Sequence, residues 1–563
     1  MERKWWKEAV VYQIYPRSFK DSDQDGIGDL PGIIGKLDYL DHLGVDVLWI
    51  SPFFKSPNVD NGYDISDYRD VMEDFGTMAD FRELIGGIHA RGMKLVMDLV
   101  VNHSSDEHAW FQESKTSRTN PKSDYYIWKD PRPDGSPPNN WQSTFSGPAW
   151  AYSEERGQYY LHVFAKKQPD LNWDNPAVRR EVHDIMRFWI DEGVDGFRMD
   201  VINLISKHFR EGEAISDDER GDYFFMGPRL HEFLQEMNRE VLSKADVMTV
   251  GECPGTTPED AVDLTDPGRN ELNMIFTFEH VELDQGEHGK WDLRDFQLMP
   301  LKENLSRWQH ALHGLGWNSL FLSNHDQPRP VSRFGDDGRY RVESAKMLAN
   351  ITHFLEGTPY IYQGEELGMT NIPISGPEDL RDVESLNAWQ DLVVERKVHT
   401  PAKMLQALRR KGRDNARSPM QWDSSASAGF SEAKPWLPVN PNYLEINAAE
   451  QLKDPSSVFN YYRRLISLRK ELPVMVYGRY SELMAGRTDV FAWERIFGEE
   501  RLIVVNNFTA EETRVDIRDI AGSDEFSLFL ANYPDFAPDA SGVYRLRPYE
   551  SFVLYNEARE EPV

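Results

Sequence analysis

Polar and charged residues stand at the ends of four apolar runs, where a purely structural strand does not need them. The runs end DLVVNH (Asp98–His103), GFRMDV (Gly196–Val201), TVGE (Thr249–Glu252) and FLSNHD (Phe321–Asp326). Taken singly, each has a structural explanation, such as a helix cap, a buried salt bridge or a surface residue. Jointly they place carboxylates, histidines and an arginine on one rim if the runs are parallel strands of one barrel. Burying that many unpaired charges costs on the order of several kcal/mol each unless function requires it.

The elements that must position these residues form a repeating pattern over the first 370 residues. Eight apolar runs of a strand's length read as buried strands, and most precede an amphipathic stretch such as PAVRREVHDIMRFWIDEG. They are Val10–Ile14, Val45–Ser51, Met93–Val100, Val194–Val201, Asp246–Glu252, Met274–Phe278, Asn318–Ser323 and Thr358–Tyr362. Buried strands that alternate with helices indicate a parallel sheet, and eight of them favour an α/β protein with a (β/α)8 TIM barrel.

The alternation is interrupted in two places and then ends. Residues 104–172 are rich in loops, aromatics and prolines, and seventy such residues are better explained by an inserted domain than by one loop. A second insertion, a subdomain within the barrel, is expected near 371–447. From 474 to 563 short alternating segments such as RLIVVNNF predict a C-terminal all-β sandwich domain. The barrel would then comprise 1–103 and 173–473.

Composition limits the partners and the compartment. The net charge of −31 disfavours nucleic acid and anionic membrane surfaces. The one cysteine, Cys253, permits no intrachain disulfide, and the N-terminal residues lack the apolar run of a signal peptide. With no apolar stretch of membrane-spanning length, we expect a cytoplasmic protein, either a monomer or a weak homodimer. Aromatics reach 12%, which fits a large core and equally fits sugar binding.

The four run ends resemble the four signature segments of the α-amylase family of glycoside hydrolases, in order and spacing. A fifth family segment, QPDLN, is present as Gln168–Asn172. The resemblance covers essentially the whole chain and implies a barrel, a domain inserted after the third strand and a C-terminal β-sandwich. It also implies that Asp200 is the nucleophile, that Glu252 is the general acid and base, and that Asp326 binds the ring hydroxyls.

The physical chemistry of retaining glycosidases agrees with these roles. Such enzymes need one ionised and one protonated carboxyl, at a separation of roughly 5–5.5 Å. Arg198 is two positions before Asp200, hence on the same face of the strand, and is expected to lower the pKa of Asp200. Glu252, in a drier place, would keep its proton. His103 and His325 resemble the family histidines that bind the sugar, although satisfied core histidines remain an alternative.

Finer motifs resemble the oligo-1,6-glucosidase and α-glucosidase branch of the family. These are FFKSPNVDNGYDISD (Phe53–Asp67) and GRDNARSPMQW (Gly412–Trp422). The resemblance implies that Asp60 and Arg413 hold the terminal glucose of a small oligosaccharide, with Arg417 as an alternative to Arg413. It also implies a sugar-stacking ring and pocket walls that close one side of the site. The remaining substrate-binding candidates are Tyr63, Phe145, Phe164 and Gln168.

Val201, directly after the nucleophile, bears on the linkage that is cleaved, and its side chain is expected to face the rim where the leaving sugar sits. In this branch a Val accompanies α-1,6 cleavage, as in isomaltose, and a Thr accompanies α-1,4 cleavage, so the resemblance favours an oligo-1,6-glucosidase. Sucrose isomerases or transglucosylases carry an Arg-rich RLDRD, where VELDQG (Val281–Gly286) stands here. Trehalose-6-phosphate hydrolase remains a further alternative. A non-enzymatic relative, like the heavy chains of amino-acid transporters, is disfavoured because the catalytic carboxylates are present.

The segment DSDQDGIGD resembles a calcium loop of related glucosidases. Asp21, Asp23, Asp25 and Asp29 occupy alternate or nearby positions, and Ile27 offers its backbone carbonyl. Gly32 stands where an EF-hand has its bidentate Glu, so this is not an EF-hand. All-oxygen ligands select a hard cation, so we expect a structural Ca²⁺ and no organic cofactor. An acidic, solvated turn is the alternative.

Overall fold

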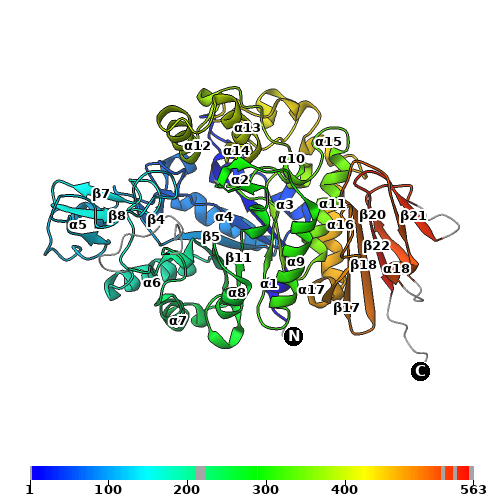
Figure 1. Ribbon diagram of the computed structural model, residues 1–563, viewed down its shortest axis with the longest axis horizontal. Helices are drawn as coiled ribbons and strands as arrows, with labels where there is room; N and C mark the ends of the chain where they lie inside the picture. The colour runs from blue at the N-terminus through cyan, green and yellow to red at the C-terminus, as the bar shows by residue number, and fades with distance from the viewer. Residues whose placement is uncertain (1–2, 210–222, 288, 522–525, 537–541, 557–563) are drawn as a thin grey trace.

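A barrel of eight parallel strands forms the centre of the molecule (Figure 1). The computed structural model describes residues 3–209, 223–287, 289–521, 526–536 and 542–556. In barrel order the strands are β11 (Met274–Phe276), β10 (Met248–Glu252), β9 (Gly196–Asp200), β5 (Lys94–Val100), β2 (Val47–Ile50), β1 (Val11–Ile14), β15 (Thr358–Tyr362) and β14 (Ser319–Leu320). A parallel bridge between Ile275 and Asn318 joins the first strand to the last and closes the barrel.

Each of the eight predicted runs contains one barrel strand, so the predicted (β/α)8 fold is confirmed. The largest difference is β14, which pairs only over Ser319–Leu320 although 318–323 was predicted. Beyond Leu320 the backbone takes other partners: the carbonyl of Phe321 bonds the His280 ring nitrogen at 2.8 Å. The apolar pattern therefore continues past the point where strand pairing stops.

Eight helices surround the barrel, one after each strand (Figure 1). Local sequence sets where several begin: Asn175 caps α6 and is followed by a proline, and Thr77 and Asp80 form a capping box at α4. In chain order the helices are α3 (Leu37–Leu43), α4 (Met78–Ala90), α6 (Pro176–Asp191), α7 (Leu230–Glu240), α8 (Pro258–Thr265), α9 (Leu298–Leu312), α11 (Arg341–Phe354) and α16 (Val458–Glu471).

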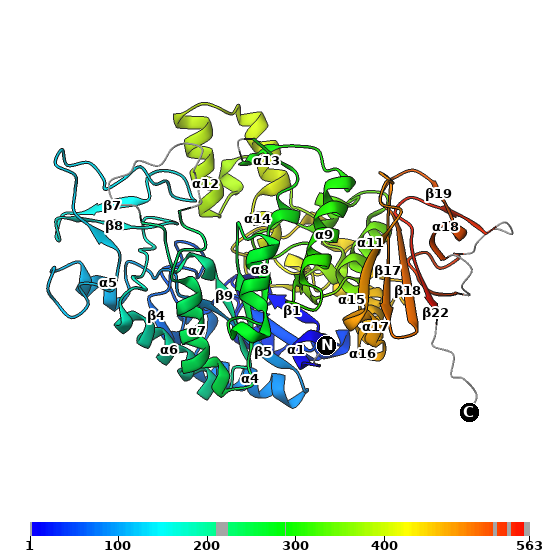
Figure 2. The ribbon, with the colours of Figure 1, turned by 60° about the horizontal axis from the view of Figure 1, so that its bottom comes forward.

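The segment between β5 and α6 projects to one side of the barrel (Figure 2). It contains α5 (Ala109–Ser114) and a three-stranded antiparallel sheet of β6 (Trp128–Lys129), β8 (Gln158–Leu161) and β7 (Trp150–Ser153). Buried Lys207, shortly after β9, bonds Asp170 at 2.9 Å and Asn102 at 3.0 Å. This ammonium group ties the end of the inserted segment to the barrel.

The segment after β15 supplies α12 (Val383–Trp389), a π-helical turn (Gln390–Glu395), α13 (Pro401–Lys411) and α14 (Asp414–Arg417). In Figure 2, α12 and α13 lie together at the top of the molecule. The Asn387 amide on α12 donates to the carbonyl of Phe145 at 3.2 Å. The two inserted segments therefore meet above the barrel.

The C-terminal domain contains two antiparallel sheets. One pairs β16 (Arg479–Leu483), β17 (Val490–Phe497), β18 (Glu500–Asn507), β22 (Ser551–Asn556) and β20 (Ser527–Ala531) in that order. The other pairs β19 (Thr513–Asp516) with β21 (Val543–Leu546). Apolar side chains of both sheets, including Val505 and Leu546, form one buried cluster. This arrangement confirms the predicted sandwich.

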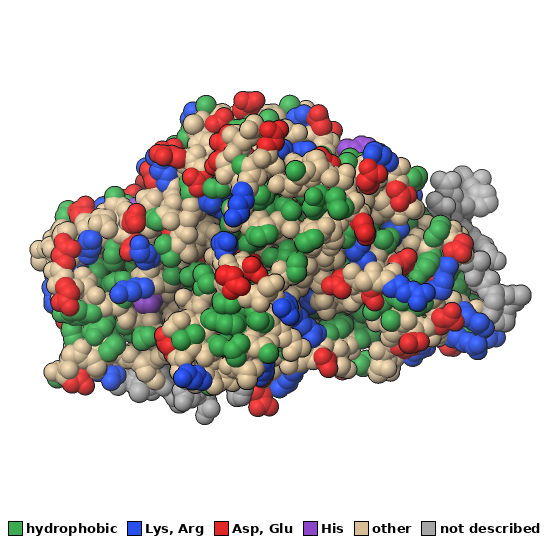
Figure 3. Space-filling model, turned by 90° about the horizontal axis from the view of Figure 1, so that it is seen from above, with side chains coloured by type: hydrophobic (Ala, Val, Ile, Leu, Met, Phe, Trp, Pro, Cys, Tyr) green, Lys and Arg blue, Asp and Glu red, His purple; other side chains and the backbone are tan. Residues whose placement is uncertain are grey.

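The surface carries mixed charge. Acidic and basic side chains are interspersed over the face seen in Figure 3, so the net charge of −31 is not gathered into one patch there. None of the helices in the described part of the chain is both long enough and apolar enough to cross a membrane.

Candidate active site

Three carboxylates surround one guanidinium at the carboxyl ends of β5, β9 and β10. Arg198 Nη1 contacts Asp98 at 2.7 Å and Asp200 at 2.8 Å, and its Nη2 contacts Glu252 at 2.7 Å. The strand register brings them together, because Asp98 pairs with Arg198 across the β5–β9 ladder. All four side chains are buried. A single buried positive charge therefore faces three acidic groups.

Burial and mutual repulsion act on the pKa values of two of these carboxyl groups. Burial raises the pKa of Asp98 to about 6 although Arg198 opposes it. Burial also raises the pKa of Asp200, and the negative charges of Glu252 and Asp98 raise it further. Arg198 lowers the pKa of Asp200, as expected, but burial and the two carboxylates outweigh this effect. The expected net lowering of the pKa of Asp200 is therefore wrong.

Asp326 is the one candidate catalytic carboxylate that its surroundings hold ionised. It contacts Arg417 at 2.6 Å, Arg413 at 3.2 Å and the ring of His325 at 3.3 Å. Burial alone would raise its pKa, but these three neighbours outweigh burial and set the pKa well below the usual range. Asp326 is thus a fixed negative charge at the rim.

Asp60 and Arg413 form an ion pair of 3.0 Å across 353 positions of sequence. Burial raises the pKa of Asp60 to about 6, although Arg413 opposes the shift. The Gln168 amide also donates to Asp60, at 3.2 Å. The structure therefore unites three binding candidates from three separate motifs on one side of the site.

Tyr63 and the two histidines line the same region. The Tyr63 ring is stacked on His325, with ring centroids 5.1 Å apart and an interplanar angle of 6°. His103 Nε2 bonds the Tyr63 carbonyl at 3.1 Å. Burial lowers the pKa of His103 to about 4 and that of His325 to about 3, so both rings are neutral at pH 7. Neutral imidazoles can donate and accept hydrogen bonds with sugar hydroxyls.

Phe145 and Phe164 come from the inserted segment and contact each other, with centroids 5.5 Å apart. Phe164 lies 5.1 Å from the His103 ring, and the Arg413 guanidinium lies 5.1 Å from the Phe145 ring. Val201 lies just beyond β9, and its side chain belongs to an aromatic cluster that includes Trp141 and Trp150. The Val201 side chain, expected to face the open rim, is instead 7% exposed and belongs to a buried apolar cluster that includes side chains of the inserted segment.

Three residues of the site were missed or left as alternatives. Asp382 is fully buried and binds Arg413 Nε at 2.8 Å and Arg417 Nη1 at 3.5 Å. No sequence signal marks it, since it stands alone in the stretch RDVES. Arg417, the alternative to Arg413, also contacts Asp326, so both arginines reach the site. Asp98, which lies in the DLVVNH run end but had no predicted role, binds Arg198.

The acidic loop after β1 gathers three of its four aspartates. Oxygens of Asp21, Asp23 and Asp29 lie within 4.8 Å of one another. Asp25 is not in this group; its carboxylate accepts the backbone N–H of Ile27 at 2.7 Å. The Asp21 carboxylate accepts the N–H of Gly26 at 2.9 Å, which fixes its orientation. Three like-charged oxygen donors suit a hard cation.

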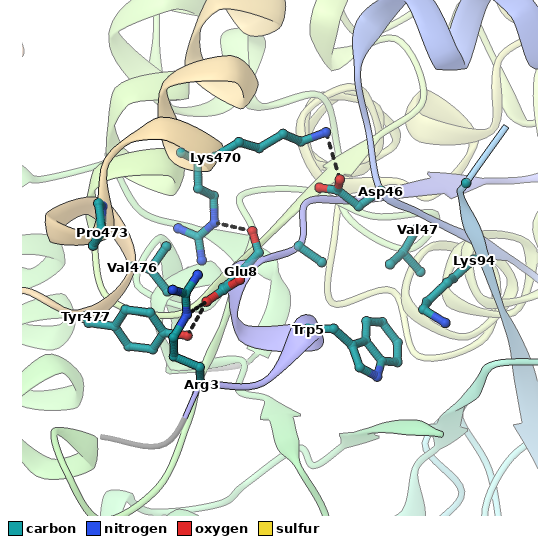
Figure 4. Close-up of a pocket in the computed structure, with 13 residues that line it drawn as sticks. Arg3, Trp5, Glu8, Asp46, Val47, Lys94, Lys470, Pro473, Val476 and Tyr477 are labelled. Carbon is teal, nitrogen blue, oxygen red and sulfur yellow. Dashed lines mark hydrogen bonds and ion pairs between the residues drawn. The ribbon is translucent and has the colours of Figure 1, made fainter. Parts of the chain in front are cut away.

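A pocket of about 310 Å³ lies at the opposite end of the barrel, where the strands begin (Figure 4). Three of its basic side chains each have an acidic partner: Lys470 with Asp46 at 2.7 Å, Arg3 with Glu8 at 2.6 Å, and Lys94 with Asp195 at 3.3 Å. Figure 4 shows the first two pairs on either side of the pocket. These charges neutralise one another locally.

Comparison with known proteins gives consistent matches along the chain. Residues 13–478 match the catalytic domain of the α-amylase family. The chain is 57% identical to an oligo-1,6-glucosidase of Parageobacillus thermoglucosidasius, covering 98% of this chain and 99% of the relative. It is 54% identical to an oligo-1,6-glucosidase of Bacillus cereus, covering 98% and 100%.

Solved structures resemble the fold equally well. A crystal structure of Bacillus licheniformis trehalose-6-phosphate hydrolase has a TM-score of 0.92 at 49% identity, covering 98% of this chain and 100% of that one. The isomaltulose synthase of Erwinia rhapontici NX5 has a TM-score of 0.94 at 44% identity, covering 99% and 100%. Fold similarity alone therefore does not separate hydrolysis from isomerisation.

Proposed function

The chain belongs to the α-amylase family of glycoside hydrolases, and from this membership we propose that it is a retaining, exo-acting oligo-1,6-glucosidase. It would remove terminal α-1,6-linked glucose from short oligosaccharides such as isomaltose, and α-1,4-linked glucose less readily. The observation that carries the proposal is the cluster in which Asp200 and Glu252 share Arg198. High identity to oligo-1,6-glucosidases over nearly the whole chain supports the linkage.

The cluster suits a double displacement. Asp200 attacks the anomeric carbon while Glu252 gives its proton to the leaving oxygen, and a water then releases the glucose with Glu252 as base. The first step needs one proton among the carboxylates and one ionised nucleophile. Burial and the repulsion between neighbouring carboxylates favour the retention of a proton, and Arg198 stabilises charge on the nucleophile through Nη1.

The exo mode rests on the Asp60 side of the site. Asp60, Arg413 and Asp326 form a connected set of ion pairs that offers both acceptors and donors to glucose hydroxyls. Such a set fits the last sugar of a chain end and leaves little room for a polymer to pass. Tyr63 supplies an aromatic face on the same side.

The two alternatives differ in their needs. A sucrose isomerase would be expected to have the arginines of RLDRD; here Asp284 of VELDQG is buried and binds Arg333 at 2.7 Å. A trehalose-6-phosphate hydrolase needs a basic phosphate site, whereas Arg413 and Arg417 are already bound to carboxylates. Both observations favour the glucosidase.

A substrate panel tests the proposal. The protein is incubated with isomaltose, maltose, sucrose, trehalose-6-phosphate and starch, and the products are analysed by chromatography and by NMR. We expect glucose from isomaltose, released first as the α-anomer, and no action on starch. Isomaltulose from sucrose, preferred hydrolysis of trehalose-6-phosphate, or release of β-glucose would each overturn it.

The acidic loop supports a structural Ca²⁺, held by Asp21, Asp23 and Asp29. An ion that binds only the folded state stabilises it by mass action, so a chelator should lower the melting temperature without changing turnover at low temperature. Asp21→Ala should melt lower and ignore calcium. Wild-type melting that is indifferent to both chelator and added Ca²⁺ would discard the site.

The proposal extends to the location and the oligomeric state of the enzyme. The single cysteine supports a cytoplasmic location, where thiols remain reduced. We expect a monomer or a weak homodimer, and light scattering over a range of protein concentrations would detect a larger assembly.

A further inference from the structure

Val201 has an unusual backbone conformation for its residue type. Its φ of 34° and ψ of 43° lie in the left-handed region, between the end of β9 and a short helical turn. Among the described residues other than glycine that have positive φ, Val201 is the only β-branched one. A β-branched residue adopts this region only when its surroundings hold it there. Something in the site must therefore maintain this conformation.

The conformation directs the Val201 N–H at the proposed general acid. This N–H donates to Glu252 Oε2 at 3.0 Å. Arg198 Nη2 contacts the same oxygen at 2.7 Å. A proton on Oε2 would lie among two donors, so a transferable proton is better placed on the other oxygen, Oε1. Two fixed donors thus distinguish the two oxygens of one carboxyl group.

The strained residue is buried in an apolar cluster that includes side chains of the inserted segment. The Val201 side chain is 7% exposed and belongs to a cluster with Trp141, Trp150, Leu161 and Val163 of that segment. The same cluster contains Leu204, whose N–H donates to the Val201 carbonyl at 2.9 Å. Burial of the isopropyl group in this cluster and the bond from the helical turn to the carbonyl therefore hold the residue.

We propose that Val201 is a positioning residue for acid catalysis, and that the inserted segment acts on the chemistry through it. The inference rests on the proposed role of Glu252. As the bond from the anomeric carbon to the leaving oxygen breaks, an Asp200 oxygen bonds that carbon and the proton on Glu252 Oε1 passes to the leaving oxygen. In the second step a water oxygen bonds the anomeric carbon, the bond from that carbon to the Asp200 oxygen breaks, and the water gives a proton to Oε1.

Three substitutions separate positioning from simple packing. Val201→Ala keeps a smaller backbone penalty, since it still has a Cβ, and loses the methyls that are buried in the cluster, so the backbone should relax and the N–H should leave Glu252. Val201→Gly loses more volume but enters the left-handed region freely. Val201→Thr keeps the β-branched shape. If Val201 positions Glu252, the contribution of acid catalysis should be highest in the wild type and Val201→Thr, lower in Val201→Gly and lowest in Val201→Ala. If Val201 only fills space, that contribution should be lowest in Val201→Gly.

The measurement compares two leaving groups. Phenyl α-glucoside needs a proton on its leaving oxygen, and 2,4-dinitrophenyl α-glucoside does not. The ratio of kcat/KM for the phenyl glucoside to kcat/KM for the dinitrophenyl glucoside therefore reports acid catalysis alone. General acids contribute about 10²–10⁴-fold, and we expect Val201→Ala to lower the ratio about tenfold, Val201→Gly less, and Val201→Thr not at all. Melting curves of each variant control for folding.

Two results would overturn the inference: a ratio that is equal in all variants, or a ratio lower for Gly than for Ala. If Val201→Ala does not fold, equal ratios for Gly and Thr have the same meaning. Failure of the proposed function is a separate result, because it would appear as a wild-type protein that hydrolyses neither isomaltose nor the aryl glucosides.

Discussion

The two ends of the barrel differ in how their charged groups are paired and how deeply they are buried. Where the strands begin, Lys470, Arg3 and Lys94 each have a carboxylate partner of their own (Figure 4). Where they end, one guanidinium faces Asp98, Asp200 and Glu252. There, burial and the repulsion between neighbouring carboxylates raise the pKa values of Asp98 and Asp200 against the lowering effect of Arg198. Raised carboxyl pKa values favour the retention of the proton that a glycosidase needs.

The largest expected effect comes from removing the nucleophile at the end of the barrel where one guanidinium faces three carboxylates. Asp200→Asn keeps the volume and the fold but should abolish turnover of isomaltose, because no carboxylate remains to bond the anomeric carbon. We expect a loss of more than about a hundredfold in kcat. Residual activity above that level, in protein checked for deamidation by mass spectrometry, would argue that Asp200 is not the nucleophile.

Glu252→Gln should divide substrates by leaving group. The amide cannot give a proton, so glycosylation with isomaltose should fall by about 10²–10⁴-fold. An activated aryl glucoside should keep its glycosylation rate, measured as a pre-steady-state burst of the phenol. If both substrates lose equal activity in that step, Glu252 is not the acid.

The pH dependence of kcat/KM tests whether the ionisation of Asp60, which pairs with Arg413, affects activity. Burial raises the pKa of Asp60 to about 6, so the group is ionised at pH 7 and mostly protonated at pH 5. Protonation weakens its pair with Arg413 and removes an acceptor for sugar hydroxyls. We expect kcat/KM for isomaltose to fall about tenfold from pH 7 to pH 5, the drop for one ionising group. A flat profile across this range, with the protein folded by circular dichroism, would contradict the prediction.

Val201→Thr adds one hydroxyl group at the end of the barrel that carries Asp200 and Glu252. Thr is nearly the size of Val, so any change in specificity comes from that polar group, which can reach a maltose-type leaving sugar only through the 7% of the side chain that is exposed. A hydrogen bond of this kind contributes roughly 0.5–1.5 kcal/mol, about three- to tenfold in relative rate. We expect the ratio of kcat/KM for maltose to that for isomaltose to rise by that factor. An unchanged ratio, or a wild type that already prefers maltose, would make the linkage assignment wrong.

The smallest effect is expected at the end of the barrel where the strands begin and each of these basic side chains has its own carboxylate partner. Lys470 is 47% and Asp46 30% exposed, and ion pairs of this exposure contribute about 0–1 kcal/mol. Lys470→Ala should leave kcat/KM unchanged and the free energy of unfolding within about 1 kcal/mol in urea titrations. A large loss of activity would show that the two ends are coupled, and the comparison between them would fail.

The sequence by itself determined the barrel and the residues at its rim. Each barrel strand is a short apolar run that is buried along its whole length, so eight strands could be predicted from the local sequence pattern. The polar ends of those runs marked Asp200, Glu252 and Asp326 because parallel strands deliver their carboxyl ends to a single edge. The predicted domain boundaries and the roles of these residues stay predictions.

Only the tertiary structure decided how charge is divided among those residues. A pKa depends on burial and on every neighbouring charge, so the sharing of Arg198 and the position of isolated Asp382 could not be seen in any local pattern. The left-handed Val201 is a further case, because its own residue type disfavours the conformation. Val201 is buried in an apolar cluster with side chains of an inserted segment far away in sequence, and this cluster exists only in the folded chain.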